Sequence, residues 1–204
     1  MKLFDVLFEE KGENLLLLDI DDTLLKANNI FVIKKNPDGS ETKLTPDQYA
    51  KEKVTPENQN NYDYREFRDP DKVYDSITTG LPIIPNLKII DEYIKRGWKV
   101  GVLTARAFEE VTFNALKDWL QYRDKTGNLQ AIGDKLVRGL VYAVNDENKK
   151  YRGTTSFERK ANVIQDLAKR YDRIVLIDDD PKNLKAVRDL HLQNVFVKQA
   201  HKVD

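Results

Sequence analysis

Apolar residues in this chain fall into short runs separated by polar segments, and the clearest run lies near its start. Leu15-Leu16-Leu17-Leu18 leads directly into Asp19-Ile20-Asp21-Asp22-Thr23. Four leucines between polar residues are too few for a helix, and they are typical of a strand covered on both faces. We therefore predict a central parallel strand that ends in three carboxylates and a threonine.

From residue 81 onwards, helical and strand patterns alternate. Apolar residues at helical spacing predict helices over residues 85–96, 107–121, 154–170 and 181–190. Short β-branched and aliphatic runs predict strands over residues 98–103, 140–144, 173–177 and 194–197. Residues 122–138 are ambiguous, with a helix around residues 132–137 as one interpretation. The alternation predicts an α/β fold, a Rossmann-like parallel sheet sandwiched by helices.

A different pattern interrupts this alternation between residues 28 and 80. Two β-rich runs flank Asn36-Pro37-Asp38-Gly39-Ser40, which predicts a hairpin, and Thr45-Pro46 predicts a short helix that ends near residue 53. Residues 54–79 are polar and broken. Their aromatic residues and arginines at 62–68 form either a small lid or a solvated connection docked on the core. We expect a core of residues 1–27 and 81–204, with a flap hairpin and small cap at 28–80.

Composition narrows the function classes. The 204 residues suit one well-buried core, and 34 Lys and Arg balance 34 Asp and Glu, so no global field attracts nucleic acid or an anionic membrane. The absence of cysteine excludes disulfides, thiolate zinc sites and a cysteine nucleophile. The first ten residues lack the apolar core of a secretory signal, and no segment is long enough to span a membrane. We expect a cytoplasmic protein, and nothing indicates its oligomeric state.

Unusual polar clusters follow several predicted strands. Asp19 and Asp21 follow the first strand, Thr104-Ala105-Arg106 follows the next, and Asp178-Asp179 follows the strand near residue 175. Ligands of open α/β sheets bind beyond the carboxyl ends of the strands, so we expect these residues to converge. Carboxylates that lie close together need a cation or a shared proton, and oxygen ligands favour a hard divalent ion such as Mg²⁺.

The same clusters resemble the motifs of the haloacid dehalogenase-like phosphohydrolase superfamily. The first motif of that superfamily, Asp-x-Asp-x-Thr after an apolar strand, is matched by Asp19-Ile20-Asp21-Asp22-Thr23. The second, a strand-end threonine, is matched by Thr104. The third, a helix lysine, is matched by Lys160, and the fourth by Asp178-Asp179 with Asn183. The resemblance spans residues 15–197 except for the insertion, and it implies a Rossmann-like core with a cap.

The resemblance also implies a role for each residue. Asp19 would be the nucleophile that forms an aspartyl-phosphate, and Asp21 would protonate the leaving oxygen and then activate water. Asp19, the backbone carbonyl of Asp21, and Asp178 would bind Mg²⁺. Thr104 and Lys160 would hold the phosphoryl oxygens, and Lys160 would also offset the charge on Asp19. Supporting roles would fall to Asp179 and Asn183.

Some of these positions have simpler interpretations. Asp180 precedes Pro181 and is expected to cap a helix rather than bind a ligand. Asp22 and Thr23 fit a turn, and Lys160 by itself could be an exposed helix lysine. Arg106 either pairs with Asp22 or contacts the substrate, and the sequence does not distinguish between these two roles.

The expected function is therefore Mg²⁺-dependent hydrolysis of a phosphomonoester. A small cap leaves the site open, and Arg65 and Arg68 among aromatic residues suit a nucleobase, with some similarity to polynucleotide 3′-phosphatase domains. A nucleotide or nucleic-acid 3′-phosphate end ranks first as the phosphorylated substrate, although zero net charge counts against long polymers. The alternatives are a small-metabolite or phosphoprotein phosphatase, a phosphomutase, and a module that binds a phosphorylated partner without turnover.

Overall fold

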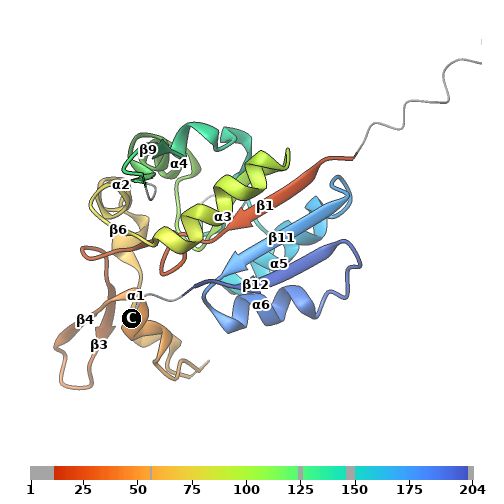
Figure 1. Cartoon of the computed structure of the whole chain (residues 1–204). Coiled ribbons are helices and arrows are strands. Elements are labelled where there is room, and N and C mark those ends of the chain that lie inside the picture. Colours follow the sequence, from red (N-terminus) through yellow and green to blue (C-terminus); the bar gives the residue numbers. More distant parts are fainter. Residues whose placement is uncertain (1–11, 56, 124–125, 146–149, 202–204) are drawn as a thin grey trace, which may run out of the picture.

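The central feature of the computed structural model, which describes residues 12–55, 57–123, 126–145 and 150–201, is a five-stranded parallel sheet (Figure 1). Its strands, in spatial order, are β10 (Val141–Ala143), β7 (Lys99–Thr104), β1 (Asn14–Leu18), β11 (Arg173–Asp178) and β12 (Val195–Gln199). The α/β prediction is confirmed. Successive strands step outward from β1 on one side through β7 and β10, and then on its other side through β11 and β12. The order therefore reverses between β1 and β11.

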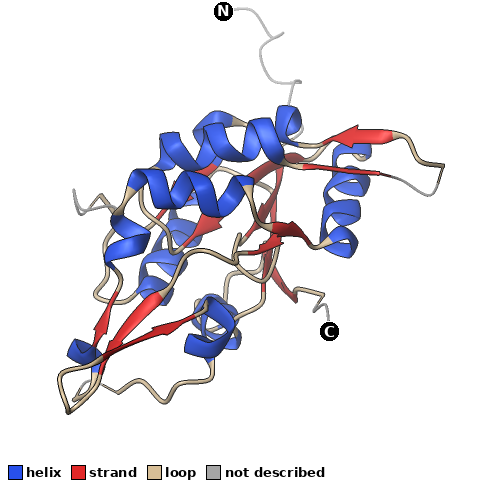
Figure 2. Cartoon of the chain, turned by 90° about the vertical axis from the view of Figure 1, so that its left-hand side faces the viewer, coloured by secondary structure: helices blue, strands red, loops and turns tan. Residues whose placement is uncertain are grey.

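Helices cover both faces of this sheet (Figures 1 and 2). Leu16 and Leu18 pack with α2 (Pro70–Thr78), α3 (Ile84–Lys95) and α4 (Glu109–Trp119) on one face. Leu15 and Leu17 pack with α5 (Ser156–Leu167) and α6 (Pro181–Arg188) on the other. Successive side chains of a strand point to opposite faces, so the four leucines supply both cores. In the part of the chain that the structure describes, no helix is long and apolar enough to cross a membrane.

Local signals account for most helix ends. α5 begins with the predicted capping box, in which the Thr155 hydroxyl accepts the Glu158 N–H and the Glu158 carboxylate accepts the Thr155 N–H. Asp180 caps α6 by accepting the Lys182 N–H at 2.8 Å, as predicted. Gly97 follows α3 with φ of 79°, the left-handed conformation that ends many helices.

Residues 122–138 correct the helical interpretation. The described residues of this range lie in two paired antiparallel strands, β8 (Gln121–Arg123) and β9 (Leu129–Ala131), and in two short 3₁₀ turns, η3 (Gly133–Lys135) and η4 (Arg138–Leu140). The segment is drawn against α4, because the N–H groups of Ile132 and Gly133 both donate to the Leu120 carbonyl at 2.9 Å. A Cβ on Gly133 would lie 2.3 Å from the Lys117 carbonyl oxygen. Tertiary packing therefore determines the secondary structure of this segment.

The insertion (residues 28–80) contains a second, antiparallel sheet. Its strands lie in the order β4 (Glu41–Leu44), β3 (Val32–Lys35) and β5 (Tyr62–Asp63), which confirms the predicted hairpin. The predicted helix after Thr45 is α1 (Pro46–Ala50), shorter than expected. Two 3₁₀ turns follow, η1 (Gln59–Asn61) and η2 (Arg65–Arg68). Val32, Leu44 and Tyr62 form a small core beneath this sheet.

Two further elements tie the insertion to the main sheet. β2 (Leu25–Lys26) pairs with β6 (Leu81–Pro82), so the insertion leaves and re-enters at one place. Helix α2 was not predicted, although Asp69-Pro70 repeats the capping signal of Asp180-Pro181. Val73 and Ile77 of α2 are fully buried in the main core. The last third of the insertion therefore packs with the central domain.

Candidate functional site

The candidate site lies where the strand order reverses. Asp19 directly follows β1, and its backbone N–H donates to the Ile177 carbonyl of β11 at 2.9 Å. Asp178 is the last residue of β11. The two carboxylates therefore leave neighbouring strands at their carboxyl ends, the position at which α/β sheets bind ligands.

A buried lysine joins these carboxylates. Lys160 of α5 is only 1% exposed, and its ammonium donates to Asp19 at 2.9 Å and to Asp178 at 2.8 Å. Burial by itself would lower the pKa of Lys160, but the charges of Asp178 and Asp19 outweigh it and raise that pKa. Lys160 is therefore charged at neutral pH, and it is not the exposed helix lysine of the simpler interpretation.

Asp178 is held rigidly. It is fully buried, and one of its oxygens accepts the Asp180 N–H at 2.9 Å. The Asn183 amide donates to both carboxylate oxygens, at 2.9 and 3.0 Å. Asn183 therefore orients Asp178, the supporting position that the sequence suggested for it.

Asp179 adds a third carboxylate to this pair. Oxygen atoms of Asp19, Asp178 and Asp179 all lie within 4.8 Å of one another. Burial, together with neighbouring carboxylates, raises the pKa of Asp19 to about 7 in spite of Lys160, and the same causes raise the pKa of Asp179 to about 8. One ammonium does not neutralise three carboxylates. This oxygen-only donor set with excess negative charge fits a hard divalent cation.

The carboxylate of Asp21 points to a different partner. Its two oxygens accept hydrogen bonds from Arg106, at 2.8 Å from Nη2 and at 3.0 Å from Nε. Arg106 is fully buried, so the structure replaces both sequence-based options for it, pairing with Asp22 and contact with the substrate, by an ion pair with Asp21. The expected metal contact of Asp21 involved its backbone carbonyl, which this ion pair leaves unchanged.

The turn between Asp19 and Leu25 is built from backbone hydrogen bonds. The Ile20 carbonyl accepts N–H groups from Thr23, Leu24 and Leu25, and Asp22 adopts a left-handed φ of 54°. Thr23 is fully buried, and its hydroxyl lies 3.5 Å from an oxygen of Asp179. These contacts match the interpretation of Asp22 and Thr23 as residues that shape the turn.

Thr104 ends β7 but is fully buried. Its hydroxyl accepts the backbone N–H of Arg106 at 3.3 Å, whereas the next residue, Ala105, lines the cavity described below. The expected phosphate contact of Thr104 therefore requires a hydroxyl that in this structure stabilises the turn after β7.

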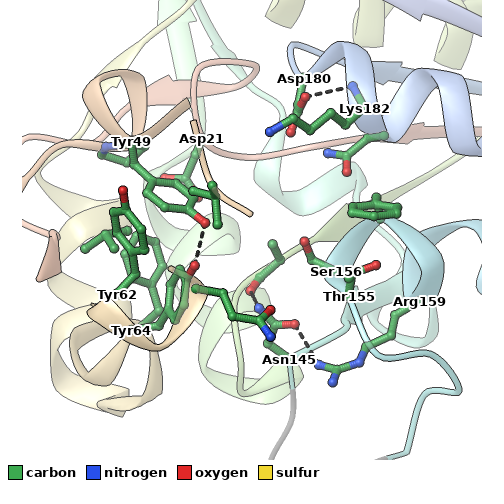
Figure 3. Close-up of a pocket in the computed structure, with 18 of the residues that line it drawn as sticks. Asp21, Tyr49, Tyr62, Tyr64, Asn145, Thr155, Ser156, Arg159, Asp180 and Lys182 are labelled. Atoms are coloured by element: carbon green, nitrogen blue, oxygen red, sulfur yellow. Dashed lines mark hydrogen bonds between the residues drawn. The ribbon is translucent and has the colours of Figure 1, made fainter. Parts of the chain in front are cut away.

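A cavity of about 920 Å³ opens in front of the carboxylates. Asp19, Asp179 and Lys160 line its floor together with the start of α5, and the insertion supplies the facing wall with Tyr49, Tyr62 and Tyr64. Figure 3 shows the three rings on one side of the cavity and Thr155, Ser156 and Arg159 on the other.

The tyrosine wall is a connected group. The rings of Tyr62 and Tyr64 each pack edge-on against Tyr49, with centroids 5.4 and 5.6 Å away. The hydroxyls of Tyr49 and Tyr64 hydrogen-bond to each other, and burial raises the pKa of both, so they remain neutral at physiological pH. The aromatic residues thus form a wall of the cavity. This arrangement is closer to the predicted small lid than to the alternative prediction of a solvated connection.

The three arginines suggested as substrate contacts have different surroundings. Of these three, all within the described residues, only Arg68 lines the cavity. Arg65 is exposed and forms an ion pair with Glu41 of β4. Arg106 is buried against Asp21. Sequence proximity to the aromatic residues therefore did not predict which arginine faces the cavity.

Three polar residues of the site were missed by sequence reasoning. Asn145 follows β10, and its side chain donates to the Ala105 carbonyl at 2.6 Å and accepts from Arg159 at 2.9 Å. Asn86 is fully buried at the start of α3 and donates to the Thr23 carbonyl at 2.7 Å. Ser76 contacts Arg106 from α2. A polar residue at a strand end, or on an otherwise apolar helix face, was the available signal for Asn145 and Asn86.

In comparisons with known proteins, no protein-family model matches this chain, and no curated protein matches it significantly. The residues of the site themselves are therefore the basis for a proposed function.

Proposed function

We propose that this protein is a Mg²⁺-dependent phosphomonoester hydrolase that acts through an aspartyl-phosphate, in the manner of the haloacid dehalogenase-like enzymes that its motifs resemble. The observation that carries the proposal is the charge cluster at the cavity floor. Asp19 lines the cavity, Lys160 bridges it to Asp178, and Asp179 brings a third carboxylate within 4.8 Å. A reactive carboxylate beside a cation site is what phosphoryl transfer to an aspartate requires.

The first half of the reaction phosphorylates Asp19. A carboxylate oxygen of Asp19 attacks the phosphorus, the bond from phosphorus to the ester oxygen breaks, and that oxygen leaves with the electron pair. Asp21, which also lines the cavity, donates a proton to the leaving oxygen. Lys160 favours the ionised form of Asp19, which is the nucleophilic form.

The second half releases phosphate. A water oxygen attacks the phosphorus of the aspartyl-phosphate while Asp21 accepts a proton from that water. The bond between Asp19 and phosphorus then breaks, which yields inorganic phosphate and restores the carboxylate. Asp21 thereby returns to the protonation state that begins the next cycle.

The residues present fit a bound Mg²⁺. Asp19, Asp178 and Asp179, with the backbone carbonyl of Asp21, would hold it, and Asn183 would fix the orientation of Asp178. When bound, Mg²⁺ supplies positive charge that offsets the repulsion between the Asp19 carboxylate and the phosphate dianion. Burial and the neighbouring carboxylates raise the pKa values of Asp19 and Asp179, and a cation bound there would favour their ionised forms.

The insertion is proposed to act as a small cap that recognises the rest of the substrate. A cavity of about 920 Å³ is much larger than a phosphoryl group, and its far wall combines the three tyrosines with the exposed cations of Lys35 and Arg68. Lys182 of α6 adds an exposed cation on the opposite side. Aromatic rings with nearby cations suit a nucleobase and a second phosphate. A nucleotide or a nucleic-acid 3′-phosphate end is therefore the proposed substrate class, ahead of a small sugar phosphate or a phosphoprotein.

The test is hydrolysis of p-nitrophenyl phosphate with and without Mg²⁺. We expect Mg²⁺-dependent turnover by the wild type and a loss of at least about a thousandfold in Asp19→Asn. Asp172→Asn is the matched control, because Asp172 is exposed at the opposite end of β11 from Asp178, and it should keep wild-type activity. Acid quenching during turnover should trap phosphate on Asp19.

Two results would contradict the proposal. Equal activity of the wild type and Asp19→Asn would remove Asp19 as the nucleophile. Mg²⁺-dependent binding of phosphorylated compounds without any hydrolysis would indicate a phospho-ligand binding module instead. A panel of nucleotides, oligonucleotide 3′-phosphates and sugar phosphates then ranks the substrate classes by kcat/KM.

A further inference from the structure

Arg106 is buried between the proposed acid and base Asp21 and a helix of the insertion. Its side chain is fully buried. Nε and Nη2 donate to the two oxygens of Asp21, while Nη1 donates to the Ser76 hydroxyl at 2.5 Å and to the Val73 carbonyl at 3.2 Å. Ser76 in turn donates to that same Val73 carbonyl at 2.9 Å. Asp21 is thus linked to α2 through one guanidinium.

This geometry restricts Asp21 more than a single hydrogen bond would. A guanidinium is planar, and two parallel bonds to a carboxylate fix the plane and direction of that carboxylate. Each carboxylate oxygen can still accept a second hydrogen bond, so Asp21 keeps the capacity to exchange a proton in the cavity that it lines. Arg106 therefore sets the orientation of Asp21 without blocking it.

The contacts of Arg106 differ from those of Lys160 in their origin. Lys160, Asp19 and Asp178 all belong to the central domain. The groups that hold Nη1 of Arg106 belong to α2, which lies in the insertion by sequence and packs against α4 in the main core. The nucleophile Asp19 is thus positioned by the central domain, whereas the orientation of Asp21, the proposed acid and base, depends on the insertion.

We propose that Arg106 is a positioning residue for proton transfer by Asp21, and that Ser76 and the Val73 carbonyl of α2 hold Arg106 in place. The proposal rests on the phosphohydrolase function proposed above. It assigns α2 a part in the reaction itself, separate from substrate recognition by the tyrosine wall. Displacement of Arg106 impairs the steps that need a proton from or to Asp21, and it spares attack by Asp19.

Substrates with different leaving groups distinguish these steps experimentally. An aryl phosphate such as p-nitrophenyl phosphate departs as a stable phenolate, so its transfer to Asp19 needs little help from an acid. An alkyl phosphate departs as a basic alkoxide and needs the proton of Asp21. Hydrolysis of the aspartyl-phosphate needs Asp21 as the base for either substrate.

The experiment compares Arg106→Lys, Ser76→Ala and Thr79→Ala on an aryl and an alkyl phosphate with Mg²⁺. Arg106→Lys keeps a cation but loses the planar pair of bonds, and we expect kcat/KM for the alkyl ester to fall about a hundredfold and for the aryl ester less than tenfold. Release of p-nitrophenolate should then show a burst followed by slower turnover, because the aspartyl-phosphate accumulates. Ser76→Ala should shift both readouts in the same direction by a smaller factor.

Thr79→Ala is the matched control. It also removes one hydroxyl at the end of α2, but that hydroxyl is exposed and donates to the Asp75 carbonyl at 2.7 Å. Its ratio of alkyl to aryl kcat/KM should equal that of the wild type.

Equal losses on both esters without a burst, in Arg106→Lys and in Ser76→Ala, would overturn the positioning role and leave the proposed function intact. A wild-type protein without Mg²⁺-dependent hydrolysis would instead end the proposed function. If Arg106→Lys does not fold, the ratio of alkyl to aryl kcat/KM and the burst in Ser76→Ala test the positioning role, since this variant retains the Val73 contact of Arg106.

Discussion

The two sides of the cavity consist of different kinds of residues. The floor includes the charged groups Lys160 and Asp19, and Asp178 lies behind them, bonded to Lys160. All three are less than 10% exposed and come from the main sheet and its helices. The facing wall consists of neutral tyrosines from the insertion, of which Tyr62 is buried and Tyr49 and Tyr64 are half-buried. Figure 3 shows the neutral wall facing the residues of α5 and α6 across the cavity.

This difference indicates a division of labour. Buried charges are costly unless each has a partner, so their geometry is held tightly and suits the reacting atoms. Half-buried aromatic rings tolerate ligands of varied shape and contribute mainly contact area. We therefore expect substitutions on the floor to change turnover and stability, and substitutions on the wall to change chiefly the affinity for the substrate.

The largest effect is expected from Lys160→Met. Removal of the ammonium leaves Asp19 and Asp178 buried beside each other, which should lower the free energy of unfolding by about 3–5 kcal/mol. Turnover should fall at least about a hundredfold, because the charge on Asp19 and on the phosphate loses its partner. Urea denaturation and the p-nitrophenyl phosphate assay measure the two effects.

Lys169→Met is the control for this prediction. Lys169 follows the end of α5 and forms an ion pair with Asp166 at 2.9 Å, but it is largely exposed. Exposed pairs contribute little, so this variant should match the wild type in both assays. Equal stability of the two methionine variants would show that the buried cluster is not stabilised by Lys160.

Mg²⁺ should stabilise the protein, and more strongly at higher pH. Asp19 and Asp179 have folded-state pKa values raised to about 7 and about 8, above their ordinary value of 3.8. The folded protein therefore binds these protons more tightly than the unfolded chain, and their contribution to stability, fully present below pH 4, is lost as pH rises to about 8. Mg²⁺ binds the ionised carboxylates and compensates for this loss.

The measurement is the melting temperature at pH 6 and pH 8 with and without Mg²⁺. At a Mg²⁺ concentration 100 times Kd, the free energy of unfolding should increase by about 2.7 kcal/mol, which raises the melting temperature. Asp179→Asn should weaken both the gain from Mg²⁺ and the decline in stability with pH. A shift of the same size at both pH values, in the wild type and in Asp179→Asn, would show that Mg²⁺ binds elsewhere.

A smaller effect is expected on the facing wall. Arg68→Ala should raise KM for a nucleotide substrate about fivefold with little change in kcat, because Arg68 lines the cavity from the insertion and is expected to contact only the non-reacting part of the substrate. Arg65→Ala, three residues away, should leave both constants unchanged, since Arg65 pairs with Glu41 on the surface. Equal effects of the two variants on KM would remove the distinction that the structure makes between them.

The smallest effect is expected from Tyr64→Phe. It removes the hydroxyl that bonds to Tyr49 and retains the ring, so the free energy of unfolding should fall by about 0.5–1.5 kcal/mol. Tyr74→Phe removes a hydroxyl from an exposed tyrosine of α2 and should have no measurable effect in the same urea titration. A loss of several kcal/mol in Tyr64→Phe would contradict the view that the wall is weakly coupled to the core.

Neighbouring residues were sufficient to predict many elements of this protein. The leucine run before Asp19 predicted β1, and the Thr155 and Glu158 pair predicted the start of α5. Asp180 was correctly predicted to cap α6. Strand periodicity, capping boxes and glycine stops depend on residues within one or two turns of each other, so a single sequence contains them. The same local signals placed Asp19, Thr104 and Asp178 at strand ends.

Only the tertiary structure decided how the distant charges pair. The resemblance implied the pairing of Lys160 with Asp19, and the structure joins Lys160 to Asp178 as well. The structure also brings Asp179 into the same cluster and turns Asp21 towards Arg106 instead of leaving Arg106 to Asp22. It also places Ser76 of the unpredicted helix α2 against Arg106. These contacts depend on which strands are neighbours and on which charges are buried together. Both follow from packing over the whole chain, and no local pattern determines them.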